Sequence, residues 1–239
     1  MQALNDLREF VACGPHALRE RLAFVRTLWS FVDLVKHPDH LDRVFEISDG
    51  VVKQRTEVLG KMAEHFARNE RGAQAIRDKH RVRFELAALD TLPEGTLGRV
   101  FASHMRKNNL DPADIPTLEA HDDFEYVRAH LYETHDIWHA VTGYDTDVAG
   151  ELGLQAFYAA QAPGGLPWML LAMGFLNTAL YSMEDRERRF DAIARGWDMG
   201  KRARPLFGTR WDDLWTTPVA EVRRALGVVP YTETLTLAA

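Results

Sequence analysis

The stretch YETHDIWHAVTGYDTDVAGE, residues 132–151, predicts two helices joined by a short turn. Gly143 suits the residue that ends the first helix, because glycine adopts the left-handed backbone of a helix C-terminus without steric cost. The segment Asp145–Asp147 offers side-chain oxygens that can cap a second helix, which is expected to begin near Val148. A turn this short favours antiparallel packing of the two helices.

The same helical spacing of apolar residues recurs over most of the chain, for example from Val51 to Phe66, and alternating strand patterns are nearly absent. Breaks between helices are expected at 37–39, 69–72, 92–95, 111–116, 143–147, 163–167, 205–209 and 217–218. No repeat or linker divides the chain. We therefore predict one compact all-α domain over residues 1–239, with about eight helices and an antiparallel helix pair at residues 132–151.

Composition excludes several classes of function. The chain has 239 residues, 46% of them hydrophobic, which is enough for a substantial core. It carries 29 basic and 35 acidic residues, so its net charge of −6 argues against a nucleic-acid partner bound through overall positive charge. A single cysteine, Cys13, excludes an internal disulfide and a multi-thiolate metal cluster.

The N-terminal residues do not follow the pattern of a secretory signal, and Asp6 and Glu9 argue against a transit peptide, so a bacterial cytoplasmic location is expected. The long uncharged stretch 152–183 is interrupted by prolines and glycines at 163–167. Its second part, Trp168–Met183, is short for a membrane span and is expected to form a buried helix.

Candidate metal ligands gather around the predicted turn. At about 100° per residue, His135, Asp136 and His139 project from one helix within an arc of roughly 100°, and histidines four residues apart can bind one cation. Folding back at the turn places Glu151 at about the height of His139. The pattern predicts a divalent metal held by these residues, with Asp136 and Glu151 as candidate catalytic groups. Asp136 is either a ligand or a group that orients an imidazole or accepts a proton. Zinc, iron, manganese and cobalt all suit this ligand set.

Other metal enzymes place different residues at these positions. A zinc metalloprotease needs glutamate at the position of Asp136. A ferritin-like di-iron protein needs a histidine three residues after each ligating glutamate, but here Asp136 stands three residues after Glu133 and Leu154 three residues after Glu151. A His-Asp phosphohydrolase stays open as an alternative. Its further ligands would come from His104, His121, His130, Asp185 and Asp191.

The pattern His135-Asp136-x-x-His139, eleven intervening residues and Glu151 resembles the signature of the coenzyme Q (ubiquinone) biosynthesis protein 4 family. Further segments similar to that family are Leu92–Gly98, Asn109–Pro112, Gly196–Gly200, Trp211–Trp215 and Val222–Gly227, and the resemblance covers residues 37–228. Tyr132-Glu133 departs from an Arg-Glu pair that many members carry. Arg128 and His130 are candidates to supply the basic contact in its place.

This resemblance implies an all-α fold and a zinc site formed by His135, Asp136, His139 and Glu151. It implies removal of the ring carboxylate from a polyprenylated 4-hydroxybenzoate precursor, with hydroxylation of that carbon in the oxidative version, and contact with other ubiquinone-biosynthesis proteins. As a hypothesis, the metal acts as a Lewis acid on the substrate carboxylate or phenolate. A prenyl-lipid-binding scaffold without catalysis is the alternative within the family.

A polyprenyl tail needs an apolar channel and brings the protein to a membrane surface. Candidate lining residues are Leu154, Phe157, Tyr158, Trp168, Leu171, Met173, Phe175 and Leu176, for which ordinary core packing is the alternative. The basic stretch 68–85 suits either contact with anionic headgroups or a solvated helix. We expect a peripheral position on the cytoplasmic face of the bacterial inner membrane, and a homodimer is plausible.

Overall fold

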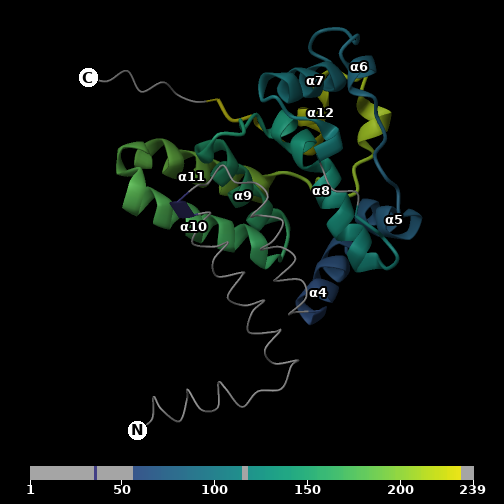
Figure 1. Ribbon diagram of the computed structural model, residues 1–239. Helices are drawn as coiled ribbons and strands as arrows, with labels where there is room; N and C mark the ends of the chain where they lie inside the picture. Colours follow the sequence, from purple (N-terminus) through teal and green to yellow (C-terminus); the bar gives the residue numbers. More distant parts are fainter. Residues whose placement is uncertain (1–34, 37–55, 115–117, 233–239) are drawn as a thin grey trace. The chain divides into compact units, whose positions relative to one another are not determined.

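The computed structural model describes residues 35–36, 56–114 and 118–232. The chain divides into two units, residues 1–55 and 56–239, and the described helices lie in the second (Figure 1). Its α-helices are α4 (Thr56–Phe66), α5 (Glu70–Asp78), α6 (Leu86–Leu89), α7 (Leu97–Lys107), α8 (Asp123–Thr142), α9 (Val148–Gln161), α10 (Gly165–Tyr181), α11 (Arg186–Arg202) and α12 (Val219–Leu226).

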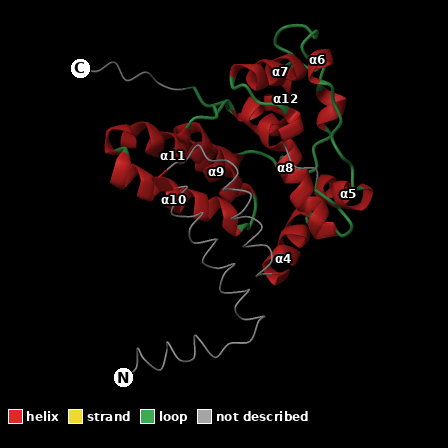
Figure 2. Ribbon diagram, in the orientation of Figure 1, coloured by secondary structure: helices red, strands yellow, loops and turns green. Residues whose placement is uncertain are grey.

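The predicted all-α class is confirmed: the described residues form nine α-helices and three short 3-10 helices and no strand (Figure 2). The predicted breaks at 92–95, 143–147, 205–209 and 217–218 fall between these helices, as do the described residues of 111–116. The breaks predicted at 69–72 and 163–167 extend into the first turns of α5 and α10, and the break at 37–39 lies outside the described residues. A single domain over residues 1–239 stays a prediction.

The predicted turn between α8 and α9 forms as the sequence indicates. Gly143 caps α8 with a left-handed φ of 81°, and its N–H donates to the carbonyl oxygen of His139. Asp147 caps α9, because its carboxylate accepts a 2.8 Å hydrogen bond from the Gly150 N–H. Each helix end is therefore fixed by the residue type that favours it.

Helix α9 packs mainly against α11 and α10 and makes fewer contacts with α8 (Figure 1). The order of the contacts between α8 and α9 is nevertheless that of antiparallel helices. His139 contacts Glu151 in the first turn of α9, whereas His135, one turn earlier in α8, contacts Tyr158 further along α9. The two helices are thus joined by residues of the candidate site and by the packing of Trp138 against Phe157 and Tyr158.

Close contact between α9 and α11 depends on glycine. A Cβ atom at Gly196 would lie 2.0 Å from the carbonyl oxygen of Gly153, which no rotamer change can relieve. At Gly200 a Cβ would lie 2.7 Å from the carbonyl oxygen of Phe157. The spacing of these two helices is therefore set by backbone contact.

We predict that Gly196→Ala lowers the free energy of unfolding by about 1–3 kcal/mol, because the methyl group forces α9 and α11 apart. This loss is expected despite the higher helix propensity of alanine, worth about 1 kcal/mol. Urea unfolding measures the effect. The matched control is Gly165→Ala at the start of α10, where a Cβ would meet nothing within 4 Å, and equal stability of the two variants would contradict the prediction.

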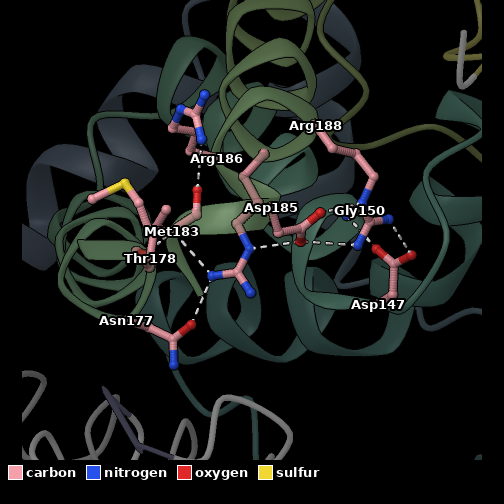
Figure 3. A network of polar contacts seen from close by, with 10 residues as sticks. Asp147, Gly150, Asn177, Thr178, Met183, Asp185, Arg186 and Arg188 are labelled. Atoms are coloured by element: carbon pink, nitrogen blue, oxygen red, sulfur yellow. Dashed lines mark hydrogen bonds and ion pairs between the residues drawn. The ribbon is translucent and has the colours of Figure 1, made fainter. Parts of the chain in front are cut away.

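A buried polar network joins α10, α11 and the start of α9 (Figure 3). The Arg189 guanidinium, 6% exposed, donates to Asp185 at 2.9 Å and to the Asn177 side chain at 2.6 Å. Arg188 donates to Asp185 and also to Asp147, the cap of α9, at 2.8 Å. The network thereby ties the first turn of α9, where Glu151 lies, to α11.

Helix α10 is buried on one face only, which corrects the expectation of a buried helix. Leu171 and Met173 are buried, and Gly174 lies against the side chain of Leu152, whereas Trp168 and Leu180 are 53% and 63% exposed. Among the described residues no single helix is both long and apolar enough to cross a bilayer. Taken together, α10 and Met183–Arg202 meet that test as a pair bent by 119°.

Candidate metal centre

Three of the predicted ligands meet at the junction of α8 and α9. The Nε2 atoms of His135 and His139, one helical turn apart, lie 3.2 Å from each other. Glu151, in the first turn of α9, places Oε1 3.1 Å from His139 Nε2 and Oε2 3.8 Å from His135 Nε2. Two ligand atoms at about 2.0–2.1 Å from a tetrahedral ion lie about 3.3 Å apart. The donor atoms therefore have the spacing that a metal ion requires.

Asp136 belongs to the same group. Its carboxylate and the ring nitrogens of His135 and His139 all lie within 4.8 Å of one another. The structure thus places both Asp136 and Glu151 near the two histidines, and Asp136 is near enough to the imidazoles either to bind an ion or to accept a proton beside it. Ligation itself stays a prediction.

The ring of His139 is oriented for metal binding. Its side chain is fully buried, and Nδ1 donates a hydrogen bond to the carbonyl oxygen of Tyr144 at 3.1 Å. A neutral imidazole protonated at Nδ1 leaves the Nε2 lone pair free, and this atom faces His135 and Glu151. The turn that ends α8 therefore also sets the tautomer of a candidate ligand.

The charges of these groups are coupled. Burial raises the pKa of Glu151, but the nearby His139 outweighs it, so the pKa is lowered overall. Burial lowers the pKa of His139, yet the carboxylate of Glu151 and its hydrogen bond outweigh burial and raise it. Burial and the charge of His139 lower the pKa of His135. The carboxylate and the imidazole thus favour each other's charged forms, and metal binding would require a neutral His139.

Neighbouring helices hold the turn in place. Lys107 at the end of α7 forms an ion pair with Asp145. Arg223 of α12 donates to the carbonyl oxygens of Val141 and Ala140, at 2.9 and 3.0 Å, in the last turn of α8. These contacts satisfy helix-end carbonyls and restrain the backbone that directly follows His139.

Two further residues lie at the site. The ring of His104, from α7, stacks on His139 with 5.4 Å between centroids, and its buried Nε2 has no hydrogen-bond partner in the described residues. The ring of Tyr158, from α9, lies parallel to His135 at 5.9 Å. Sequence reasoning considered His104 only for a phosphohydrolase and Tyr158 only for the lipid channel, because neither lies in the His-Asp-x-x-His spacing.

The other ligands proposed for a phosphohydrolase are engaged elsewhere. Asp185 pairs with Arg188 and Arg189, and Asp191 pairs with Arg195. His130 is buried beside Tyr126, and its Nε2 accepts a hydrogen bond from the Gly208 N–H. His121 is exposed next to Glu119, 3.7 Å away. Of the five residues, only His104 contacts the site, which disfavours that alternative.

The basic contact to Glu133 comes from Arg81. Arg81 Nε donates to the two carboxylate oxygens at 2.8 and 2.9 Å, and Glu133 raises the pKa of Arg81. Arg128 instead lies over the ring of Tyr132, at 5.5 Å. The suggestion that Arg128 or His130 replaces the basic residue absent at position 132 stays a prediction.

The basic stretch 68–85 does not form one solvated helix, because α5 ends at Asp78. Lys79 pairs with Asp123 of α8, and Arg71 donates to Thr209, so part of its positive charge is used within the protein. Contact of this stretch with headgroups stays a prediction.

The residues predicted for a lipid channel separate into two sets. Leu154, Phe157, Tyr158, Leu171 and Met173 are buried, whereas Trp168, Phe175 and Leu176 are 40–53% exposed. Two surface cavities, of about 570 and 770 Å³, lie around Arg71 and Gly208–Arg210, and neither is lined by a residue of these sets or of the metal site. The channel stays a prediction.

Comparison with known proteins identifies the family of the chain. Residues 19–232 match the family model described as coenzyme Q (ubiquinone) biosynthesis protein Coq4. The chain belongs to the Coq4 family. A solved structure, described as a putative ubiquinone biosynthesis protein from Nostoc punctiforme, is 31% identical to this chain with a TM-score of 0.73, and the match covers 84% of this chain and 96% of that one.

Eukaryotic Coq4 proteins are similar to this chain over a smaller share of their own length than the Nostoc punctiforme protein is. The mitochondrial ubiquinone biosynthesis protein COQ4 of Yarrowia lipolytica is 30% identical over 70% of this chain and 65% of its own. That of Aspergillus niger is 34% identical over 66% of this chain and 55% of its own. The chain thus spans less than two thirds of these Coq4 relatives.

Proposed function

We propose that this Coq4-family chain is a metal-dependent enzyme of ubiquinone biosynthesis that removes the ring carboxylate of a polyprenylated 4-hydroxybenzoate precursor. The observation that carries the proposal is the convergence of His135 Nε2, His139 Nε2 and the Glu151 carboxylate within 3.1–3.8 Å, with Asp136 beside them. A lone ion pair between His139 and Glu151 would not need a second imidazole nitrogen directed at the same point.

The donor set fits a divalent metal. Two neutral imidazoles and one or two carboxylates form a common zinc site, and zinc is favoured here, although iron, manganese and cobalt accept the same donors. The Tyr144 carbonyl that holds His139 Nδ1 is the kind of outer partner that metal-binding histidines have. When bound, zinc supplies Lewis acidity that stabilises a carboxylate or phenolate oxygen.

The residues of the chain account for the proton that decarboxylation requires. The bond between the ring carbon and the carboxylate breaks, carbon dioxide leaves, and the electron pair stays on the ring carbon, which must gain a proton. Asp136 and Glu151 are candidates to relay that proton from solvent, each taking it up before passing it to the ring carbon. The oxidative version would in addition need dioxygen, one atom of which becomes the oxygen of the new ring hydroxyl, and a two-electron reductant that converts the other atom to water.

We further propose that the chain works at a membrane surface, on the cytoplasmic face of the bacterial inner membrane. Large apolar side chains are exposed on α10, α11 and the short segment between them: Trp168, Phe175, Leu176, Leu180, Tyr181, Met183, Phe190 and Trp197. These exposed apolar side chains suit insertion among lipid headgroups. A scaffold role favours the same face, where a second copy of the chain or other ubiquinone-biosynthesis proteins would dock.

Replacing Glu151 by glutamine tests the proposal, because the amide keeps the shape of the side chain and removes its charge. We expect metal content, measured by elemental analysis, to fall by about 10-fold or more, and ubiquinone synthesis to be lost in a bacterial strain that depends on this chain. The matched control is Glu187→Gln on α11, whose side chain is 81% exposed.

The outcomes separate the candidate functions. Loss of both metal and ubiquinone in a folded Glu151→Gln protein supports catalysis. Normal ubiquinone synthesis despite loss of metal supports a scaffold, and normal metal content with normal synthesis would contradict the proposed centre.

A further inference from the structure

The ring of Tyr158 is held against α8 by two stacking contacts. It lies parallel to the indole of Trp138, with 4.3 Å between centroids and an angle of 8°, and parallel to the imidazole of His135 at 5.9 Å. Tyr158 is 7% exposed, so little freedom of movement remains. The side chain is thus fixed in place next to a candidate metal ligand.

The hydroxyl of Tyr158 has no hydrogen-bond partner in the described part of the chain. Two other buried tyrosines do have partners: Tyr126 donates to the carbonyl oxygen of His80 at 3.0 Å, and Tyr144 donates to that of Ala192 at 2.9 Å. A buried hydroxyl without a partner costs stability, and phenylalanine would pack the same ring without that cost. A bound ligand that accepts a hydrogen bond from this hydroxyl would remove that cost.

The surroundings of this hydroxyl define what it can bind. A tyrosine hydroxyl carries its proton at neutral pH, so the hydroxyl of Tyr158 can donate a hydrogen bond. The side chain of His135 beside it is 32% exposed, so the site is open to solvent on that side. A ligand oxygen carrying negative charge is the best acceptor for such a donor.

We infer that the Tyr158 hydroxyl donates a hydrogen bond to a carboxylate or phenolate oxygen of an aromatic acid bound at the His135–Glu151 site. Tyr158 then contributes to substrate recognition, a role that lies outside the four candidate ligands. The inference rests on the proposed function, because it takes the ligand to be an aromatic acid at that site.

Tyr158→Phe tests this inference, since the variant keeps the stacked ring and removes only the hydroxyl. Calorimetric titration of the metal-loaded full chain with 4-hydroxybenzoate is expected to show binding about 10-fold weaker than in the wild type. Metal content should be unchanged. The urea midpoint of the metal-free variant should equal or exceed that of the wild type, because the unpartnered hydroxyl is gone.

Tyr126→Phe is the matched control, because it removes a buried hydroxyl that already has a partner in the chain. We expect this variant to be less stable and to bind 4-hydroxybenzoate as the wild type does. Unchanged binding in Tyr158→Phe, or a stability loss equal to that of Tyr126→Phe, would overturn the proposed role of the Tyr158 hydroxyl and leave the proposed function standing. If the metal-loaded wild type binds no 4-hydroxybenzoate, the proposed function fails and the inference fails with it.

Discussion

Replacing His139 by asparagine is expected to lower the affinity of the chain for its divalent metal by at least about 100-fold. Loss of an outer partner of a metal ligand already costs about 10- to 100-fold, and His139 is a candidate ligand itself. The asparagine amide can still donate to the Tyr144 carbonyl in place of Nδ1, but nothing replaces Nε2. Metal content after dialysis against a competing chelator, measured by elemental analysis, gives the affinity.

His121→Asn is the control for the His139 variant, because the His121 side chain is 78% exposed and lies away from the site. It should retain wild-type metal content. Circular dichroism shows whether both variants are folded, so that loss of metal is not mistaken for loss of structure. A folded His139→Asn protein that keeps one metal ion per chain would rule out His139 as a ligand.

The helix boundaries around the site could be predicted from single residues. Gly143 and Asp147 are helix-capping residue types, and the structure uses both as caps. The break at Ser182 could not be predicted in this way, because no proline or glycine stands there. The exposed face of α10 was also missed, because a helix without charged residues gives no sign of which face is buried. Close contact of Gly174 with Leu152 decides the buried face, and such contacts depend on the three-dimensional packing.

The candidate site was predictable to the extent that its ligands lie close in the sequence. His135, Asp136, His139 and Glu151 span one helix end and one turn, so local rules place them together. The surrounding residues come from other helices, and their arrival depends on tertiary packing. His104 reaches the site from α7, which no periodic pattern connects with α8.

The partner of Glu133 illustrates the same limit. Arg81 lies 52 residues before it, in a segment outside any α-helix. Sequence reasoning looked for basic residues near Tyr132, namely Arg128 and His130, and did not consider Arg81 as a partner of Glu133. A single sequence therefore gives the local part of the site, while its electrostatic surroundings require the fold.

Acid is expected to destabilise the fold through His130, a buried residue outside the site. His130 is 1% exposed, and its Nε2 accepts a hydrogen bond from the Gly208 N–H at 3.3 Å. Burial, with smaller effects from His80 and Arg81, lowers the pKa of His130 to about 4 from the ordinary value of 6.5. The neutral ring is therefore the form that the folded chain accommodates.

The sign of the pH dependence follows from these two pKa values. Above pH 6.5 His130 is neutral in both the folded and the unfolded chain and contributes no pH dependence. Below pH 6.5 His130 becomes protonated in the unfolded chain, whereas in the folded chain it stays neutral down to about pH 4. The free energy of unfolding should therefore fall by about 2 kcal/mol between pH 7 and pH 5, and by about 3 kcal/mol at pH 4.

His130→Gln separates this contribution from that of other histidines, because the glutamine oxygen can accept from the Gly208 N–H but does not titrate. Urea unfolding at pH 7 and pH 5 should show a loss in the variant that is about 2 kcal/mol smaller than in the wild type. His121→Gln, at an exposed site, should retain the full wild-type loss. Equal acid sensitivity of His130→Gln and the wild type would mean that protonation elsewhere, for example at His104 beside the metal ligands, governs acid unfolding.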